Sequence, residues 1–252
     1  MWYNVTKKVK KGRKFDKMIL KNKYLMIILA VIIIKTNFSI NVQAKEYNRF
    51  NNISIEDGLS QATVETMMQD SKGYIWLGTN DGLDRYNGYT FKKYSYEKGQ
   101  ENSLINSYIL DIKEDSEGNI WVATAAGISK IYNDGEKVQN YTSDSESGNL
   151  SNDNTTTMLI SNSNKIYVGT AEGINLYDKK TDKFNLIYPE LKEEYVNSLA
   201  EDKYGNIWAG TENGLYKINV VTNAIERFES TDDVNTISEN YIYKVYYDGD
   251  KH

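Results

Sequence analysis

The sequence repeats one short phrase four times, and this repetition constrains the fold more than any other feature. The clearest copy runs from Asp70 to Leu83 and reads Asp-Ser-Lys-Gly-Tyr-Ile-Trp-Leu-Gly-Thr-Asn-Asp-Gly-Leu. Further copies begin at Asp115, Ser161 and Asp202. The aromatic residue of the phrase lies at positions 76, 121, 167 and 208, so the copies are 45, 46 and 41 residues apart. A period of this size is typical of propellers, solenoids and other arrays of small structural units.

Within one copy, the residue pattern predicts short strands joined by tight turns. Asp at the first place and Gly at the fourth suit a type I turn at Asp70–Gly73. The Ile- and Trp-containing segment Tyr74–Leu77 follows as a strand, and Leu83–Tyr86 is the next. Asn87-Gly88 predicts a two-residue hairpin leading to a last strand at Phe91–Tyr94. Four short strands in about 45 residues form one blade of a β-propeller, so we predict an all-β fold.

The repeated phrase resembles the two-component regulator propeller repeat, which occurs in the sensor ectodomains of bacterial signalling proteins. The matching pattern is Asp-x-x-Gly-x-Ile-Trp-x-Gly-Thr-x-x-Gly-Leu, and Glu56–Gln61 resembles the start of such a domain. The resemblance covers residues 50 to 252, although the second copy has Ala123 for Gly and the third lacks the Asp, the turn Gly and the Trp. It implies a full ring of about seven blades. A sialidase-type Asp-box does not match, because Asp70 lies three residues before Gly73 rather than two.

Leucine residues that lie 17 positions before each repeat aromatic predict the blade boundaries. They place four blades near 59–103, 104–149, 150–190 and 191–236, followed by a partial fifth blade over 237–252. Ile237 in the same role puts the next aromatic residue at position 254, beyond His252. Phe50–Ile55 has the spacing of an outer strand without a blade of its own, and such a strand often completes the last blade of a closed ring. We therefore expect an N-terminal fragment of a longer propeller, with the partial propeller domain over 45–252.

Residues 1–44 are predicted to be a signal peptide or an N-terminal membrane segment. Residues 1–23 contain nine Lys or Arg against one acid, and Tyr24–Ile34 is an apolar run of eleven residues. This run is shorter than the roughly 20 residues that span a bilayer and suits the core of a signal peptide. Small residues at Val42-Gln-Ala44 predict cleavage after Ala44. A translation start at Met18 would leave a short basic region, residues 18–23, before the apolar run. The alternative is an uncleaved membrane anchor.

Beyond position 44 the chain is acidic. Ten of the 30 basic residues and one of the 35 acids precede position 45, so 20 basic and 34 acidic residues remain and the net charge is near −14. This charge argues against nucleic-acid partners and against adhesion to anionic lipid. The absence of cysteine is compatible with a domain outside the cytoplasm that relies on sheet packing. We expect an exported protein on the extracellular or periplasmic face of the cytoplasmic membrane.

The sequence predicts no catalytic, cofactor-binding or metal residue in this fragment, and no cofactor. His252 is the single histidine and there is no cysteine, which removes Ser-His and Cys-His nucleophiles and His-ligated transition metals. We interpret the recurring acids as turn residues, because a catalytic acid should break the repeat, and the recurring tryptophans as packing between blades rather than as sugar platforms. These residues are Asp70, Asp115 and Asp202 and Trp76, Trp121 and Trp208.

Two acidic loops and four variable loops remain as binding candidates. Asp144–Gly148 and Asp232-Asp233 lack the spacing of a dedicated calcium site, and we interpret them as solvated loops. The loops before each first strand differ between copies, and loops on one face of a rigid scaffold are common binding sites. They are Ser60–Thr63, Ile105–Tyr108, Ser151–Asn154 and Lys192–Tyr195. No single residue among them stands out, so the ligand-binding residues stay unassigned.

The resemblance implies the ectodomain of a membrane-anchored, dimeric signalling protein. Such a protein binds an extracellular ligand, for example an oligosaccharide, and relays the signal to a cytoplasmic histidine kinase or nucleotide cyclase, which this chain lacks. One alternative is a secreted propeller lyase or hydrolase that acts on glycans, and it predicts a cluster of acids, Tyr and Arg that breaks the repeat. Another is an extracellular scaffold for protein contacts. A membrane helix of about 20 residues after position 252 would favour the sensor.

Overall fold

The computed structural model describes residues 21–23, 25–26, 52–144 and 149–249. The chain divides into two units, Met1–Asn51 and Asn52–His252. The described residues of the first unit are helical, and none of the described helices is long and apolar enough to cross a bilayer. Apart from these few positions, the predicted export signal lies outside the described residues, and so do Met18 and the predicted cleavage position at Val42–Ala44.

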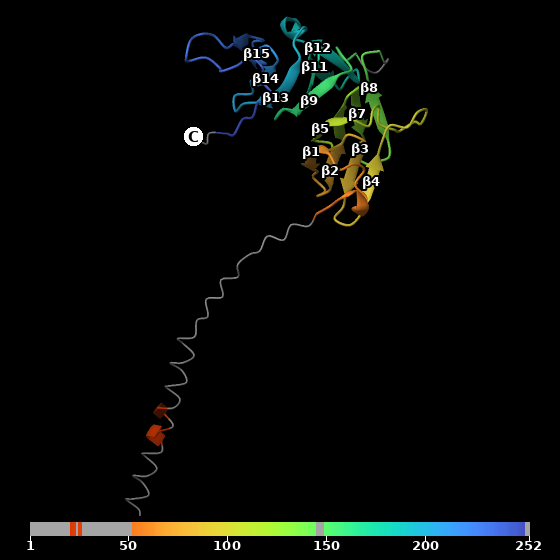
Figure 1. The fold of residues 1–252 in the computed structure, drawn as a ribbon, viewed down its shortest axis with the longest axis vertical. Coiled ribbons are helices and arrows are strands. Elements are labelled where there is room, and N and C mark those ends of the chain that lie inside the picture. The colour runs from red at the N-terminus through yellow and green to blue at the C-terminus, as the bar shows by residue number, and fades with distance from the viewer. Residues whose placement is uncertain (1–20, 24, 27–51, 145–148, 250–252) are drawn as a thin grey trace, which may run out of the picture. The chain divides into compact units, whose positions relative to one another are not determined.

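The described part of the second unit contains sixteen strands in four antiparallel sheets, each with its strands in sequence order (Figure 1). Blade one contains β1 (Val64–Gln69), β2 (Ile75–Thr79), β3 (Gly82–Tyr86) and β4 (Phe91–Tyr94). Blade two contains β5 (Ile109–Glu114), β6 (Ile120–Thr124), β7 (Gly127–Ile131) and β8 (Val138–Tyr141). Blade three contains β9 (Thr155–Ile160), β10 (Ile166–Thr170), β11 (Gly173–Asp178) and β12 (Lys183–Ile187). Blade four contains β13 (Val196–Glu201), β14 (Ile207–Thr211), β15 (Gly214–Ile218) and β16 (Ile225–Phe228). The predicted all-β class and the four-stranded blades are confirmed.

Two short 3-10 helices complete the described elements, and one of them changes an expectation. They are η1 (Ile55–Asp57) and η2 (Pro189–Leu191). Ile55 was expected to end an outer strand, but it begins η1, and residues 52–54 belong to no strand. Ser54 caps this turn, because its side chain accepts a hydrogen bond from the Glu56 N–H and its N–H donates to Asp57. The other end of the expected strand, Phe50, lies outside the described residues.

The recurring Asp holds both the turn and the tryptophan. In blade one the N–H of Gly73 donates to the Asp70 carbonyl at 2.9 Å. The Asp70 carboxylate accepts from the N–H groups of Lys72 and Tyr74 with one oxygen and from Trp76 Nε1 with the other, at 2.8 Å. The same indole bond joins Trp121 to Asp115 at 2.8 Å and Trp208 to Asp202 at 3.0 Å. The interpretation of these acids as structural turn residues is confirmed.

The core lies between neighbouring blades rather than within one blade. Trp76 is 2% exposed and packs with Leu83 and Tyr94 of its own blade and with Ile120 and Val122 of blade two. Trp121 packs in the same way against Met158, Ile166 and Val168 of blade three. At the next interface Tyr167 takes the place of the tryptophan, against Ile207 and Ala209 of blade four. Trp76 and Trp121 therefore pack between blades, as predicted. Trp208 stacks on Phe228 of its own blade, and no core cluster among the described residues includes it.

The predicted two-residue hairpin at Asn87-Gly88 is wrong. The last pair of the β3–β4 ladder is Tyr86 with Phe91, so the loop has four residues, 87–90. The Asn87 side-chain oxygen accepts from the N–H groups of Tyr89 and Thr90, and the Asn87 N–H donates to the Thr90 carbonyl. Asn87 thus stabilises a wider loop through its own side chain.

Residues after blade four begin to repeat the contacts of an inner strand. The N–H of Ile242 donates to the Thr211 carbonyl at 2.8 Å. A Cβ added to Gly210 would lie 2.6 Å from Ile242 Cγ2, just as one added to Gly78 would lie 2.6 Å from Ile109 Cγ2. Ile242 therefore packs on blade four as Ile109 packs on blade one, although the described residues 239–249 form no strand ladder.

Candidate functional site

The innermost strands of the four blades, β1, β5, β9 and β13, contact one another in order and lie along the inner side of the arc of blades (Figure 1). A cavity of about 420 Å³ opens on these inner strands, and we call it the central cavity. Its wall includes the second residue of each inner strand, together with the equivalent residue after blade four. These residues are Glu65, Leu110, Thr156, Asn197 and Tyr243. Alternation of side chains along a strand explains their direction, because the first residue of the strand packs on the previous blade.

Three of the four variable loops also contribute to the central cavity. Tyr108, Asn154 and Tyr195 are the last loop residues before β5, β9 and β13, and all three line the wall. Asn154 Nδ2 and the Tyr195 hydroxyl approach to 3.5 Å, which links the loops of blades three and four. The corresponding loop of blade one, Ser60–Thr63, contributes no residue to the wall.

The central cavity offers hydrogen-bonding groups and aromatic faces, with two charged residues in its wall. Asn197 Nδ2 donates to the Ile242 carbonyl at 3.2 Å, which leaves its oxygen as an acceptor. Thr156 donates to the carbonyls of its own and the next blade. Glu65 and Lys244 supply the two charges. Such a surface suits a neutral, hydroxyl-rich ligand that stacks on tyrosine rings.

Sequence reasoning located the loop positions but missed the strand positions. Glu65, Leu110, Thr156, Asn197 and Tyr243 occupy one place in the repeat and differ completely in type. That variation at a fixed position was the available signal. The two acidic loops contribute no residue to the central cavity, although positions 145–148 of the first lie outside the described residues.

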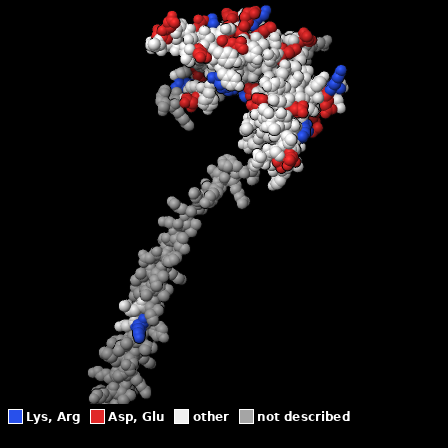
Figure 2. All heavy atoms as spheres, viewed as in Figure 1, with Lys and Arg blue, Asp and Glu red and all other residues white. Residues whose placement is uncertain are grey.

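No group of three or more His, Cys, Asp or Glu side chains among the described residues is placed to hold a metal ion. Acidic side chains are instead spread over the surface, and Asp and Glu predominate among the charged groups on the propeller face in Figure 2. This distribution agrees with the acidic composition of the chain after position 44.

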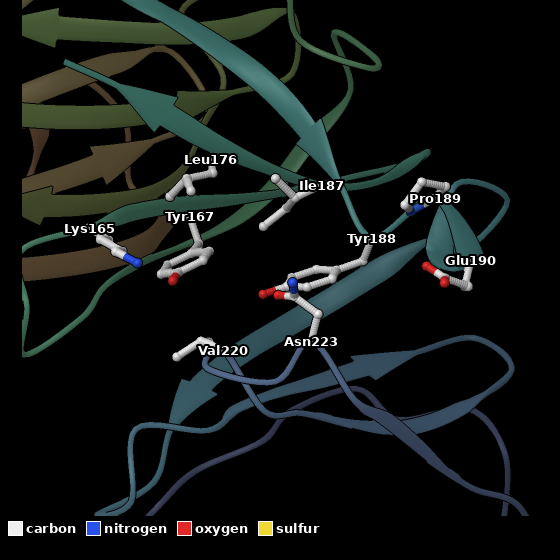
Figure 3. Close-up of a pocket in the computed structure, with 9 residues that line it drawn as sticks. All are labelled: Lys165, Tyr167, Leu176, Ile187, Tyr188, Pro189, Glu190, Val220 and Asn223. Atoms are coloured by element: carbon white, nitrogen blue, oxygen red, sulfur yellow. The ribbon is translucent and has the colours of Figure 1, made fainter. Parts of the chain in front are cut away.

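A second cavity, of about 360 Å³, lies between blades three and four, and we call it the interblade cavity (Figure 3). Blade three supplies Tyr167, Leu176, Ile187 and Tyr188, and the β15–β16 loop of blade four supplies Val220 and Asn223. Sequence reasoning did not predict this cavity. The signal was present in the third copy of the phrase, which lacks the Asp and the Trp.

Comparison with known proteins gives related repeats and related folds. The sequence profile of the family described as "Two component regulator propeller" matches residues 58–81, 103–126 and 190–213. "Histidine kinase P4" of Formosa agariphila is 39% identical over 64 residues, a segment that makes up 25% of this chain and 5% of that kinase.

Two solved structures show the fold. The extracellular domain of a protein described as a hybrid two component system, BT3049 of B. thetaiotaomicron, superposes with a TM-score of 0.54 at 21% identity, covering 71% of this chain and 32% of that one. A catalytically inactive variant of virginiamycin B lyase from Staphylococcus aureus, solved with quinupristin, gives a TM-score of 0.54 at 16% identity, covering 70% and 58%. The chain thus spans a small part of the kinase and about a third of the BT3049 domain.

Proposed function

Starting from a chain that carries two component regulator propeller repeats, we propose that it is the exported sensor ectodomain of a membrane-bound signalling protein. The observation that carries this proposal is the repeat itself. The same phrase matches three times, in a propeller whose fold is similar to an extracellular domain of a two component system and whose sequence is similar to part of a histidine kinase. The parent protein relays binding to a cytoplasmic output domain.

The ligand that the central cavity suits best is a neutral oligosaccharide. Tyr108, Tyr195 and Tyr243 offer aromatic rings on which sugar rings stack, and Asn154 and Asn197 offer amide groups that recognise hydroxyls. Glu65 and Lys244 are too few to select a strongly charged ligand. These side chains come from successive blades, so an extended ligand can contact several of them at once.

Calorimetric titration of the full chain with neutral hexasaccharides tests this ligand class. We expect the Tyr195→Ala variant to weaken binding about tenfold, because it removes a stacking face and the partner of Asn154. Tyr204→Ala is the matched control, since Tyr204 is 77% exposed and lies outside the cavity. Equal affinities for the wild type and Tyr195→Ala would contradict the assignment of the central cavity.

Export and relay are tested separately. Residues 1–60 fused to an alkaline phosphatase without its own signal should give active enzyme, and Ile28→Lys with Ile33→Lys should abolish that activity by interrupting the apolar run. For the relay, the coding sequence after His252 should encode a membrane helix and an output domain. A stop codon directly after His252 would contradict the relay and leave a binding protein.

The likeness to virginiamycin B lyase is a likeness of fold, and it gives no support to the alternative of a glycan-active enzyme. Among the residues that line the central cavity, Glu65 is the one carboxylate. Hydrolysis by paired carboxylates needs a second acid on the opposite side of the bond. Release of new reducing ends from the bound hexasaccharide would favour the enzyme over the sensor.

A further inference from the structure

Three of the four blades fill the space beside their tryptophan in the same way. In blade two, Trp121 Nε1 donates to Asp115, and its ring stacks on Tyr141 with 5.7 Å between centroids. Lys130, the cross-strand partner of Trp121, lies with Nζ 4.9 Å from the centre of the indole ring. Blades one and four repeat this group of four residues. The equivalent residues are Asp70, Trp76, Arg85 and Tyr94 in blade one and Asp202, Trp208, Lys217 and Phe228 in blade four.

Blade three replaces all four members of this group. In the same register it has Ser161 for the acid, Tyr167 for the tryptophan, Leu176 for the cation and Ile187 for the outer aromatic. The change removes an indole, a cationic side chain and an aromatic ring from one place. Because all four positions differ, the packing is altered across the whole face of blade three that contacts blade four.

The interblade cavity lies where these groups are missing. Tyr167, Leu176 and Ile187 form its blade-three wall, and Val220 and Asn223 close it from blade four (Figure 3). Its volume of about 360 Å³ falls at the lower end of the range of small-molecule sites, roughly 300–1,000 Å³. The space is therefore large enough for a small ring compound.

Charged groups lie at the two ends of the interblade cavity, with Lys165 at one end and the Glu190 carboxylate at the other (Figure 3). In Figure 3 the Lys165 amino group lies beside Tyr167, and the Tyr188 hydroxyl points toward them from the η2 side. Lys165 makes no ion pair with any residue in the described part of the chain. Burial raises the pKa of the Tyr167 phenol to about 12, and burial also raises the pKa of Tyr188. Both phenols therefore stay protonated at neutral pH and can donate hydrogen bonds.

The backbone at this end of the interblade cavity is strained. Tyr188 has φ 57° and ψ 73°, a left-handed conformation that bulky residues rarely adopt, and Pro189 follows it directly. Residues held in such conformations concentrate at ligand-binding positions. Here the strained residue is the one that directs its ring into the cavity (Figure 3).

We propose that the interblade cavity binds a small planar aromatic molecule that carries an anionic group. The aromatic ring takes the space that an indole and a stacked ring fill in the other blades, between the blade-three wall of Tyr167, Leu176 and Ile187 and the β15–β16 loop of blade four. The anionic group lies beside Lys165 and accepts hydrogen bonds from the tyrosine hydroxyls. This site is separate from the central cavity, with which it shares no lining residue.

Three compounds that share the indole ring system and differ in charge test the proposal, by calorimetric titration of the full chain. We expect indole-3-acetate to bind more tightly than indole, and indole more tightly than tryptamine. Lys165→Gln should lower the affinity for indole-3-acetate about tenfold, because it removes a charge-assisted contact. The affinity for indole should change by less than about twofold, because the walls around the ring are unchanged. Lys180→Gln is the matched control, since Lys180 is exposed and lies outside the cavity.

A second variant fills the space. Leu176→Lys with Ile187→Phe restores two groups that the other blades have, and we expect it to abolish binding of indole-3-acetate while keeping cooperative unfolding. Tyr195→Ala in the central cavity should leave indole-3-acetate binding unchanged, so failure of this site and failure of the oligosaccharide site are distinguishable. No binding of indole-3-acetate at millimolar concentration, tightest binding of tryptamine, or unchanged binding by Lys165→Gln would each overturn the proposal. In those cases the cavity is a packing defect.

Discussion

The interface between blades two and three and the interface between blades three and four use the same strands and the same register, but they are filled differently. Trp121 lies among three further rings, with its centroid 5.7 Å from Tyr141, 4.8 Å from Tyr177 and 6.0 Å from Phe184. Tyr167, in the equivalent place, borders a cavity of about 360 Å³. The comparison shows that strand pairing alone is enough to form a blade. The side chains at four repeat positions decide whether the interface with the next blade is close-packed or contains a cavity.

The largest effect should come from truncating the two equivalent aromatic residues. We expect Trp121→Ala to lower the free energy of unfolding by about 3–5 kcal/mol, because it empties a fully buried site. Tyr167→Ala should cost about 1–2 kcal/mol less, since its ring already borders open space and the site can collapse more easily. Urea denaturation of both variants measures the difference. Equal costs would show that the two interfaces are equally well packed.

The next effect concerns the turn residue. Asp115→Ala should lower the free energy of unfolding by about 2–3 kcal/mol, because the buried Trp121 indole N–H and the Asn119 N–H lose their acceptor. Ser161→Ala should cost about 1 kcal/mol, since the Ser161 hydroxyl accepts one backbone bond, from Lys165 at 3.1 Å. Thermal unfolding of the two variants ranks them. A larger loss for Ser161→Ala would contradict the comparison between the blades.

A third prediction tests how blades two and three fit together. Ala123 has a Cβ where the other blades have Gly, and Thr155 stands opposite it where the next blade elsewhere has Ile or Val. We expect Thr155→Ile to cost about 1–3 kcal/mol, because it overpacks this position and removes the hydrogen bond from Thr155 Oγ1 to the Thr124 carbonyl. Adding Ala123→Gly should recover part of that loss, with a coupling of about 1 kcal/mol in a double-mutant cycle. Strict additivity would show that the two substitutions are unrelated.

The smallest effect is a local dependence on pH. Burial alone would raise the pKa of Asp202, but hydrogen bonds from Asn206 and Trp208 to its carboxylate bring the pKa below its ordinary value. A lowered pKa stabilises the folded turn above about pH 4, and this contribution is lost as the pH falls through the folded pKa. Amide exchange at Asn206 should therefore accelerate in acid relative to that at Lys165, whose turn has no carboxylate. The Asp202→Asn variant should remove this acid dependence.

The sequence was most informative where the contacts are short in sequence. The turn of Asp70 with Gly73 joins residues three apart, and spacing alone predicted it. The indole bond from Trp76 to Asp70 is equally local, at six residues, but it was not predicted. The Asn87-Gly88 prediction was wrong although it was equally local. The Asn87 side chain accepts hydrogen bonds from the N–H groups of Tyr89 and Thr90, and these bonds stabilise a four-residue loop in place of a two-residue hairpin. Loop positions in the central cavity were predicted as a group, but the strand positions beside them were not.

By itself, the sequence determined the period, the four blades and the chemistry of the repeated turn, because each depends on residues close together in one copy. Tertiary structure alone decided which variable positions meet. Tyr167 and Val220 border one cavity although they are more than fifty residues apart, and Glu65 and Tyr243 line another from opposite ends of the propeller segment. The curvature of the blade array brings such residues together, and that curvature depends on side-chain packing between neighbouring blades, which a single copy of the repeat does not contain.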